Sequence, residues 1–145
     1  MRALLQRVTA ARVSVAGETV GAIEQGLLVY VSVARDDTAA RGETLARKVA
    51  TMRIFPDAEG KLNRSVGDVG GSILVIPNFS LLADTRKGRR PSFAPAAGSE
   101  LAKPLQEAFV RAVAQQGVGV ACGRFGADMA IESVADGPIN ILVEV

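Results

Sequence analysis

The segment Leu27–Val33 limits the fold of this chain more than any other stretch of its sequence. It is almost wholly apolar and rich in β-branched side chains. A strand with this pattern is typically covered on both faces, whereas a strand at a solvated surface alternates apolar and polar residues. We therefore expect Leu27–Val33 to be a central strand that is buried on both faces.

The pattern on either side of this strand predicts an α+β fold. Further strands are expected at residues 12–15, 19–23, 72–76, 118–122, 129–134 and 139–145. Ala16–Glu18 supplies a hairpin turn. Pro77 is expected to end the strand at residues 72–76, because proline has no N–H to donate to a neighbouring strand. The order of strands, helix, strand, long loop, helix and strands indicates an α+β fold rather than a βαβ repeat. At 145 residues the chain has the usual size of one domain, residues 1–145.

Two amphipathic helices are predicted between these strands. The first follows Asp36–Thr38, whose side chains can cap a helix, and the second begins between Ser99 and Pro104 and ends at Gly117. The expected buried stripes are Leu45, Val49 and Met52 in the first helix and Leu101, Leu105, Ala108, Phe109, Ala112 and Val113 in the second.

The chain contains no histidine and one cysteine, Cys122. Without histidine, Ser-His-Asp triads, Cys-His dyads, histidine-ligated zinc and haem with a proximal histidine are excluded. Cys122 alone cannot form an internal disulfide, and we expect it to be a small buried residue. An enzyme of this composition must use carboxylates, hydroxyls, backbone dipoles or groups of its substrate. A metal site formed only by carboxylates and water is possible, but the sequence contains no motif for one.

A long connection, residues 77–98, carries a basic cluster. The formal net charge of the chain is only +2, so long-range attraction to nucleic acid is modest. Within the connection, Arg86, Lys87, Arg89 and Arg90 are interrupted by a single glycine. Arginine grips phosphate oxygens in pairs, and a long connection in a compact domain is often functional. The cluster is therefore a candidate phosphate contact, with a solvated charged loop as the alternative.

Three other segments are candidates for chemistry. Pro77–Leu81 follows a strong strand, and its backbone N–H groups could cradle an oxyanion, although Ser80 lacks a base that would make it a nucleophile. In Gly123–Met129, Phe125 could stack on a base or sugar, or could simply fill the core. Asp136–Pro138 contains a Gly-Pro bond, and composition alone indicates trans because about 5–6% of such bonds are cis.

These segments resemble the D-aminoacyl-tRNA deacylase family from one end of the chain to the other. The resemblance rests on Met1–Ala3, Gln6–Val8, Arg53–Phe55, Asp68–Gly71, Ala83–Phe93, Gly123–Met129 and Asp136–Pro138. It implies a mixed β-sheet or barrel with two main helices, assembled as a homodimer with active sites at the subunit interface. The implied reaction is hydrolysis of the ester between a D-amino acid, or mischarged glycine, and the 3′-terminal ribose of tRNA. No cofactor and no metal are implied.

The resemblance also implies roles for individual residues. Asn78, Phe79 and Ser80 would act on the ester mainly through their backbone, while the ribose 2′-hydroxyl helps to activate water. The substrate would be bound by Phe79, Phe125, Ala127 and Met129, with the terminal adenosine against Phe79 and Met129. Gly137-Pro138, cis in the family and held by Arg7, would enter the partner's site and exclude L-amino acids. Electrostatics would place tRNA phosphates near Arg86, Lys87, Arg89 and Arg90.

The strand-end motif departs from the family pattern. Pro77–Leu81 replaces the usual Ser-Gln-Phe-Thr-Leu, Ala135 replaces a common Asn, and Ile139-Asn140 replaces Val-Thr. A related branch, which removes wrongly attached L-alanine, carries Pro at the first motif position. Two alternatives therefore stay beside D-specific hydrolysis: a deacylase of altered selectivity for L-alanyl-tRNA, and a non-catalytic tRNA-binding protein.

Two features of the sequence bear on its location. No run approaches the roughly 18 apolar residues that a membrane helix needs. Charges interrupt Met1–Arg7 too early for a signal peptide. We therefore expect a cytoplasmic protein that does not enter membranes and whose partners are aminoacyl-tRNA and a second copy of itself.

Overall fold

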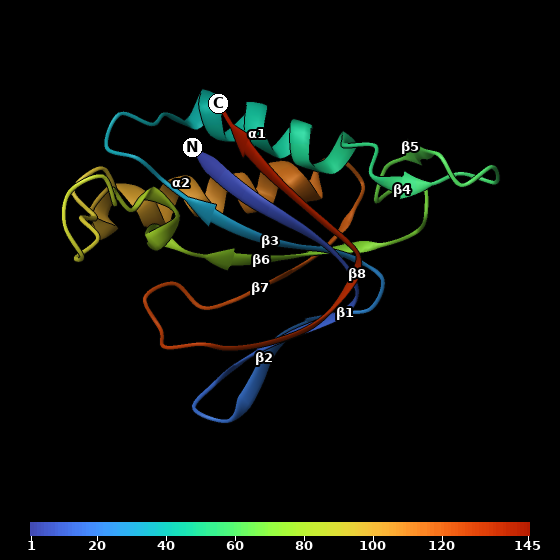
Figure 1. Ribbon diagram of the computed structural model, residues 1–145, viewed down its shortest axis with the longest axis horizontal. Coiled ribbons are helices and arrows are strands. Elements are labelled where there is room, and N and C mark those ends of the chain that lie inside the picture. The colour runs from blue at the N-terminus through green and yellow to red at the C-terminus, as the bar shows by residue number, and fades with distance from the viewer.

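The computed structural model describes residues 1–145 as a mixed sheet with two helices on one face (Figure 1). The strand order is β2-β1-β3-β6-β7, β8 pairs with β1, and β4 and β5 form a separate hairpin. The strands are β1 (Arg2–Val15), β2 (Glu18–Ile23), β3 (Gly26–Ser32), β4 (Phe55–Pro56), β5 (Leu62–Arg64), β6 (Ser72–Pro77), β7 (Gly119–Cys122) and β8 (Ala130–Glu144). The helices are α1 (Ala39–Thr51), α2 (Ser99–Ala114) and the short 3-10 helix η1 (Phe79–Leu82).

The central strand is β3, as its apolar pattern predicts. It pairs antiparallel with β1 and parallel with β6. Leu27, Val29 and Val31 pack in a 22-residue core cluster that includes apolar residues of both helices. Leu28, on the opposite face, joins a six-residue cluster with Leu74 of β6. Both faces of β3 are therefore buried, which confirms the prediction.

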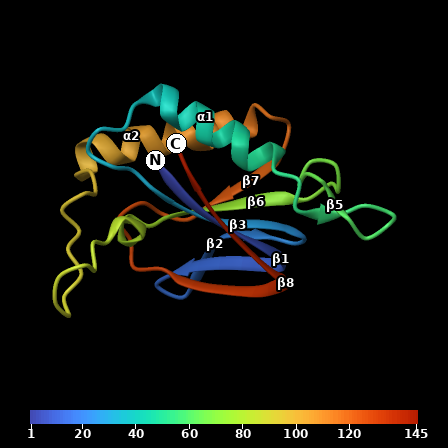
Figure 2. The same cartoon turned by 45° about the horizontal axis from the view of Figure 1, so that its top comes forward.

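The parallel part of the sheet contains two helical crossovers that the order of elements did not predict. β3, β6 and β7 are parallel neighbours, and α1 and α2 lie in the two connections between them. Figure 2 shows both helices on the same side of these strands. Two strand-helix-strand units are thus present inside the α+β fold. Their consequence is that the carboxyl ends of three parallel strands meet at one edge, where α/β proteins commonly bind ligands.

The sheet curls until it is nearly closed. β1 is long enough to pair with β3 through its first half and with β2 through its second half, while β8 follows the other edge of β1. β2 then approaches β7, where a Cβ built on Gly21 would lie 2.8 Å from the carbonyl oxygen of Cys122. Glycine permits this close approach of two backbones. The sequence predicted only the second half of β1, because its first half lacks a clear alternation.

Both helices form where the sequence predicts them, with corrections in detail. The Thr38 side chain accepts a hydrogen bond from the N–H of Arg41 and caps α1. Asp37 does not cap the helix; its carboxylate binds the amino group of Met1 at 2.5 Å and the N–H of Ala34 at 2.6 Å. Neither helix combines the length and the apolar composition that crossing a membrane requires.

The buried stripe of α2 is rotated from the predicted one. Leu101, expected inside, has 38% of its surface exposed, whereas Ala102 and Gln106 are buried together with Phe109 and Val113. These four positions follow the i, i+4, i+7, i+11 spacing of one helix face. The prediction failed because a glutamine was not expected on the inner face.

The last strand is continuous, where two strands at residues 129–134 and 139–145 were predicted. β8 runs from Ala130 to Glu144 and pairs with β1 over almost its whole length. Gln6 pairs with Asn140 and Val8 with Ala135, so the four residues 136–139 lie opposite the single residue Arg7. The Gly-Pro pair was read as a break between strands, but it is a bulge within one strand.

Candidate functional site

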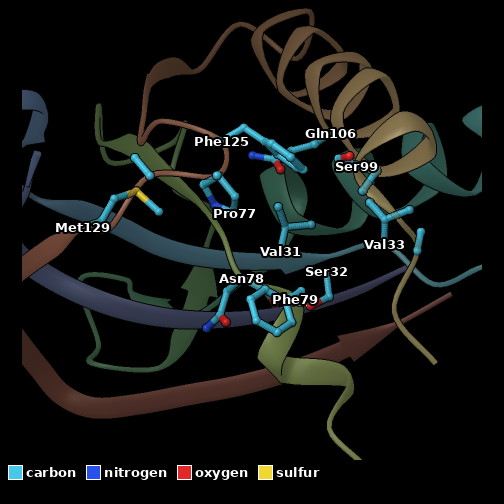
Figure 3. Close-up of a pocket in the computed structure, with 14 residues that line it drawn as sticks. Val31, Ser32, Val33, Pro77, Asn78, Phe79, Ser99, Gln106, Phe125 and Met129 are labelled. Carbon is cyan, nitrogen blue, oxygen red and sulfur yellow. Dashed lines mark hydrogen bonds between the residues drawn. The ribbon is translucent and has the colours of Figure 1, made fainter. Parts of the chain in front are cut away.

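A cavity of about 360 Å³ lies at the carboxyl ends of the three parallel strands. Its 14 lining residues come from the ends of β3 and β6, the start of η1, the first half of α2 and the loop after β7. Figure 3 shows these side chains converging from the sheet below and from α2 above. All 14 side chains are uncharged and none ionises near neutral pH. The cavity therefore offers apolar surface, hydroxyls, amides and backbone dipoles.

The strand-end residue Asn78 organises one wall of this cavity. Its N–H donates to the carbonyl oxygen of Val31 at 2.9 Å, and its own carbonyl accepts from the hydroxyl of Ser32. Its side-chain oxygen accepts from the N–H of Ser80 at 3.2 Å and from the Ser80 hydroxyl. The Asn78 side chain thus caps η1. Ser80 is held by this cap and does not line the cavity.

One backbone donor remains at the start of η1. The N–H of Leu81 donates to the carbonyl oxygen of Asn78 at 3.3 Å, and that of Ser80 is occupied by the Asn78 side chain. Phe79 is the first residue of η1, so its N–H has no acceptor inside that helix. Among the three predicted catalytic residues, Phe79 therefore has the backbone group best suited to hold an oxyanion.

The predicted substrate-binding residues come together. Phe79, Phe125, Ala127 and Met129 all line the cavity. Phe79 is 60% exposed, and its ring meets the ring of Phe93 edge to face, with centroids 5.0 Å apart. Such a ring is available on its free face for stacking. Phe125 and Met129 are half-buried, and each packs against a core cluster on one side and lines the cavity on the other.

Gln106 is a cavity residue that sequence reasoning missed. It is 8% exposed, and its carboxamide makes no hydrogen bond within the chain. Figure 3 shows it between Phe125 and Ser99, reaching into the cavity from α2. The buried side-chain atoms without a partner are Nε of Arg2 and Nε of Arg7, so the Gln106 amide is accessible from the cavity and is free to bind a ligand there. The signal was present in the sequence, since Gln106 continues the spacing of Ala102, Phe109 and Val113.

Arg7 lies under the bulge of β8, away from this cavity. Its Nε is 2.9 Å from an oxygen of Asp136, and its NH1 donates to the carbonyl oxygen of Ile54 at 2.7 Å. Its guanidinium also lies 5.8 Å from the centre of the Phe55 ring. Arg7 is 7% exposed, so these contacts fix it in the core. The buried guanidinium of Arg7 therefore supports the bulge.

Gly137 and Pro138 form the tip of the bulge. Both are exposed, and neither lines the cavity of its own chain. Their peptide bond is cis, as the family resemblance implies, and the trans bond expected from composition alone is wrong. Gly137 has a φ of +122°, a conformation that favours glycine. An added Cβ there would lie 2.9 Å from the backbone nitrogen of Ile139.

The basic cluster lies on an exposed loop whose base is closed by mutual hydrogen bonds between Asp84 and Ser92. The Arg86 guanidinium binds both oxygens of Asp84, at 2.9 and 2.6 Å, and holds the pKa of that carboxyl well below its usual range. Lys87, Arg89 and Arg90 have no ion pair. None of these four basic residues lines the cavity.

Cys122 is half-buried at the end of β7, and burial raises the pKa of its thiol. A raised pKa keeps the thiol protonated at pH values where free cysteine is partly thiolate, and the thiolate is the reactive form. We expect iodoacetamide to alkylate Cys122 at pH 8 roughly tenfold more slowly than free cysteine, with the rate still rising above pH 9. Mass spectrometry of timed samples measures this, and a rate equal to that of free cysteine would contradict it.

No group of three or more Cys, Asp and Glu side chains comes together in a geometry that could hold a metal ion. The side chains gathered at the cavity are apolar or neutral amides and hydroxyls, which are weak ligands for metals compared with thiolates and carboxylates.

The sequence is similar to a family described as D-Tyr-tRNA(Tyr) deacylase, whose profile matches residues 4–144. A D-aminoacyl-tRNA deacylase of Chloroflexus aurantiacus is 52% identical over 144 residues, which cover 99% of this chain and 90% of that protein. A D-aminoacyl-tRNA deacylase of Stutzerimonas stutzeri is 49% identical over 144 residues and 99% of both chains.

Two solved structures have a similar fold. The c-Myc DNA Unwinding Element Binding Protein superposes with a TM-score of 0.93 and 34% identity, over 100% of this chain and 99% of that chain. A probable eukaryotic D-amino acid tRNA deacylase superposes with a TM-score of 0.86 and 19% identity, over 99% and 98% of the two chains. The second likeness bears on the fold alone.

Proposed function

This chain belongs to the D-Tyr-tRNA(Tyr) deacylase family, and from that membership we propose that it hydrolyses the ester of D-aminoacyl-tRNA. It is accordingly an enzyme of the hydrolase class that acts on ester bonds. The ester carbonyl carbon gains the oxygen of water, the bond to the ribose 3′-oxygen breaks, and that oxygen leaves with a proton. The products are the free amino acid and tRNA. Mischarged glycyl-tRNA is a second proposed substrate.

The uncharged cavity lining supports a mechanism in which the substrate assists its own hydrolysis. Ester hydrolysis needs an activated water and a stabilised oxyanion, and no side chain in the cavity can take a proton near neutral pH. In aminoacyl-tRNA, a ribose 2′-hydroxyl lies next to the reacting ester, so the substrate itself supplies a group that can transfer a proton. We propose that this hydroxyl helps to activate water, while the Phe79 N–H stabilises the oxyanion.

We further propose that the enzyme is a homodimer in which the bulge of one copy completes the cavity of the other. Gly137 and Pro138 are exposed and rigidly supported by Arg7, yet they do not reach the cavity of their own chain. A backbone wedge facing the α-carbon of the substrate would leave room for a D side chain or for glycine and exclude an L side chain. Size-exclusion chromatography with light scattering tests the dimer.

The decisive experiment compares D-tyrosyl-tRNA with L-tyrosyl-tRNA. We expect the D ester to be cleaved about 100-fold faster or more, since steric exclusion costs several kcal/mol. Release of labelled tyrosine over time measures both rates. Equal rates, or no release from the D ester, would overturn the proposal.

Pro77 is the observation that favours a second candidate, release of L-alanine from mischarged tRNA. The residue lines the cavity at the position where a hydroxyl-bearing residue is usual. L-alanyl-tRNA therefore belongs in the same assay, and its preferential cleavage would support this candidate. Salt-dependent tRNA binding with no cleavage of any ester would instead support a non-catalytic tRNA-binding protein, with Arg89→Ala weakening that binding.

Gln106 provides a prediction about the terminal adenosine. A carboxamide can both donate to and accept from the edge of adenine, and Gln106 is buried at the cavity wall without another partner. We expect Gln106→Leu to raise KM for D-tyrosyl-tRNA about 10-fold, equivalent to about 1.4 kcal/mol. Gln115→Leu, the same change at the exposed end of α2, is the control. A KM within twofold of the unmodified enzyme would remove Gln106 from the adenosine site.

A further inference from the structure

A second depression, of about 440 Å³, lies beside the cavity between α2 and the loop that follows β7. Three basic side chains line it: Lys103 and Arg111 from α2, and Arg124 from the loop. Glu107 is its single carboxylate. We call this depression the α2 groove.

The charges of the α2 groove are not neutralised by contacts within the chain. Lys103, Glu107 and Arg111 are four residues apart, so they follow one face of α2. Even so, no ion pair involves any of the four charged groove residues, although Arg2, Arg12, Arg41 and Arg86 all have carboxylate partners elsewhere. Three cations and one carboxylate leave the groove with a charge of +2, equal to that of the whole chain.

The α2 groove adjoins the cavity. Gln106 and Phe125 line both of them, so these two residues form the boundary between the cavity and the groove. Gln106 is 8% exposed as a whole residue, and Figure 3 shows its carboxamide reaching into the cavity, where the amide atoms stay accessible. A ligand that fills the cavity and extends beyond it can therefore continue along α2.

We propose that the α2 groove binds the phosphodiester backbone of the single-stranded 3′ end of tRNA while the terminal nucleoside occupies the cavity. This inference rests on the proposed function, which places an aminoacylated adenosine in the cavity. Lys103, Arg111 and Arg124 contact the phosphates that precede that adenosine. Arginine holds phosphate oxygens in pairs, and lysine acts as a point charge.

The length of the α2 groove suits several phosphates. Lys103 and Arg111 are eight residues apart, which corresponds to about 12 Å along a helix axis. Stacked nucleic acid carries one phosphate per about 3.4 Å of each strand. The Arg86–Arg90 segment is less suitable for this part of the substrate. Arg86 is held by Asp84, and no residue of that segment lines the cavity or the α2 groove.

A structural role accounts for only one of the three cations. Arg111 lies in the last turn of α2, where a positive charge stabilises the helix dipole. Lys103 lies in the first turns of α2, where that interaction is unfavourable, and Arg124 is not on a helix. The helix dipole therefore does not explain why these three residues share one groove.

The test compares substrates that differ only in their phosphates. D-tyrosyl-adenosine has no phosphate, the D-tyrosyl ester of the trinucleotide CCA adds the nearest ones, and D-tyrosyl-tRNA adds the rest. The groove variant is Lys103→Gln/Arg111→Gln/Arg124→Gln. The control variant, Arg47→Gln/Lys48→Gln/Lys61→Gln, removes the same charge from exposed residues outside the groove.

We expect the unmodified enzyme to have a lower KM for the trinucleotide and tRNA esters than for D-tyrosyl-adenosine. In the groove variant, the ratio of KM for D-tyrosyl-adenosine to KM for the longer esters should fall by about 10-fold at low salt. The slope of log KM against log salt concentration should fall by about 2, as expected for three lost phosphate contacts. The control variant should keep the advantage. Because the measured quantity is a ratio between substrates of one variant, partial misfolding does not imitate the result.

The outcomes separate this inference from the proposed function. If the unmodified enzyme cleaves all three D esters and the groove variant keeps both the KM ratio and the salt dependence, the inference is overturned and the function stands. If the unmodified enzyme cleaves none of the D esters, the proposed function is overturned, and the inference falls with it.

Discussion

Gly137→Ala is expected to lower kcat/KM for D-tyrosyl-tRNA by about 100-fold or more, equivalent to about 2.7 kcal/mol of transition-state stabilisation. The new Cβ would lie 2.9 Å from both the backbone nitrogen and the Cγ1 of Ile139, and 3.3 Å from an Arg7 nitrogen. The φ of +122° is itself unfavourable for alanine. The backbone at the tip of the bulge must therefore move, and with it the surface that we propose faces the substrate.

The enzyme should remain folded after this change. Backbone strain of this kind costs about 1–3 kcal/mol, whereas a domain typically has 5–15 kcal/mol of stability. Gly60→Ala is the matched control, because Gly60 has a φ of +79°, has no atom within 4 Å of the new Cβ, and lies in the β4–β5 hairpin. Gly60→Ala should lower stability slightly and leave kcat/KM unchanged. Unchanged cleavage and unchanged D/L preference in Gly137→Ala would remove Gly137 from the site.

Mixing two inactive variants tests whether the bulge serves the partner's cavity. Ala127→Trp fills the cavity but leaves the bulge intact, whereas Gly137→Ala distorts the bulge but leaves the cavity intact. A mixed dimer would pair the intact cavity of one copy with the intact bulge of the other. After equal mixing and exchange of subunits, about a quarter of all sites should be active again. If the bulge served its own chain, no activity would return.

Gly26→Ala is expected to lower the free energy of unfolding by about 3 kcal/mol or more, which corresponds to roughly 10 °C in Tm. A Cβ on Gly26 would lie 1.8 Å from the carbonyl oxygen of Ser72 and less than 3.0 Å from two other backbone atoms of that residue. Gly26 is also the first residue of β3, the strand that joins β1 to β6. The alanine would therefore separate two strands in the centre of the sheet.

Thermal unfolding followed by circular dichroism measures this effect. Gly98→Ala is the control, because Gly98 has a negative φ of −67° and no atom within 4 Å of a new Cβ. We expect Gly98→Ala to change Tm by at most about 3 °C. A Gly26→Ala protein that unfolds within this range would show that the backbones of β3 and β6 can separate at little cost.

The sequence predicts the elements whose signals are local. β3 is recognisable because its apolar run is complete in itself, and α1 because Thr38 caps it and Leu45 and Val49 follow at helical spacing. The turn residues Asp57–Lys61 are likewise compatible with the hairpin of β4 and β5, although the short strands on either side of them have no signal of their own. Each of these signals lies within a few residues of the structure that it determines.

The features that were wrong or missing depend on distant partners. The bulge of β8 exists because Gln6 and Val8 fix the register of Asn140 and Ala135, which lie more than a hundred residues away in the sequence. The buried face of α2 includes Gln106, a polar residue at the cavity that an assignment based on apolar residues alone leaves out. The predicted residues Phe79 and Met129 line one cavity because three parallel strands end together.

The bulge of β8 also has a consequence for how such a protein can diverge. The flanking pairs Gln6–Asn140 and Val8–Ala135 hold the ladder in register on either side of the bulge. Within the bulge, Asp136 contacts the buried Arg7 and Ile139 packs against the core, whereas Pro138 is exposed. Substitutions of Pro138 can therefore reshape the surface offered to another molecule with little effect on the core. A protein built in this way can acquire new discrimination over evolutionary time while its interior stays the same.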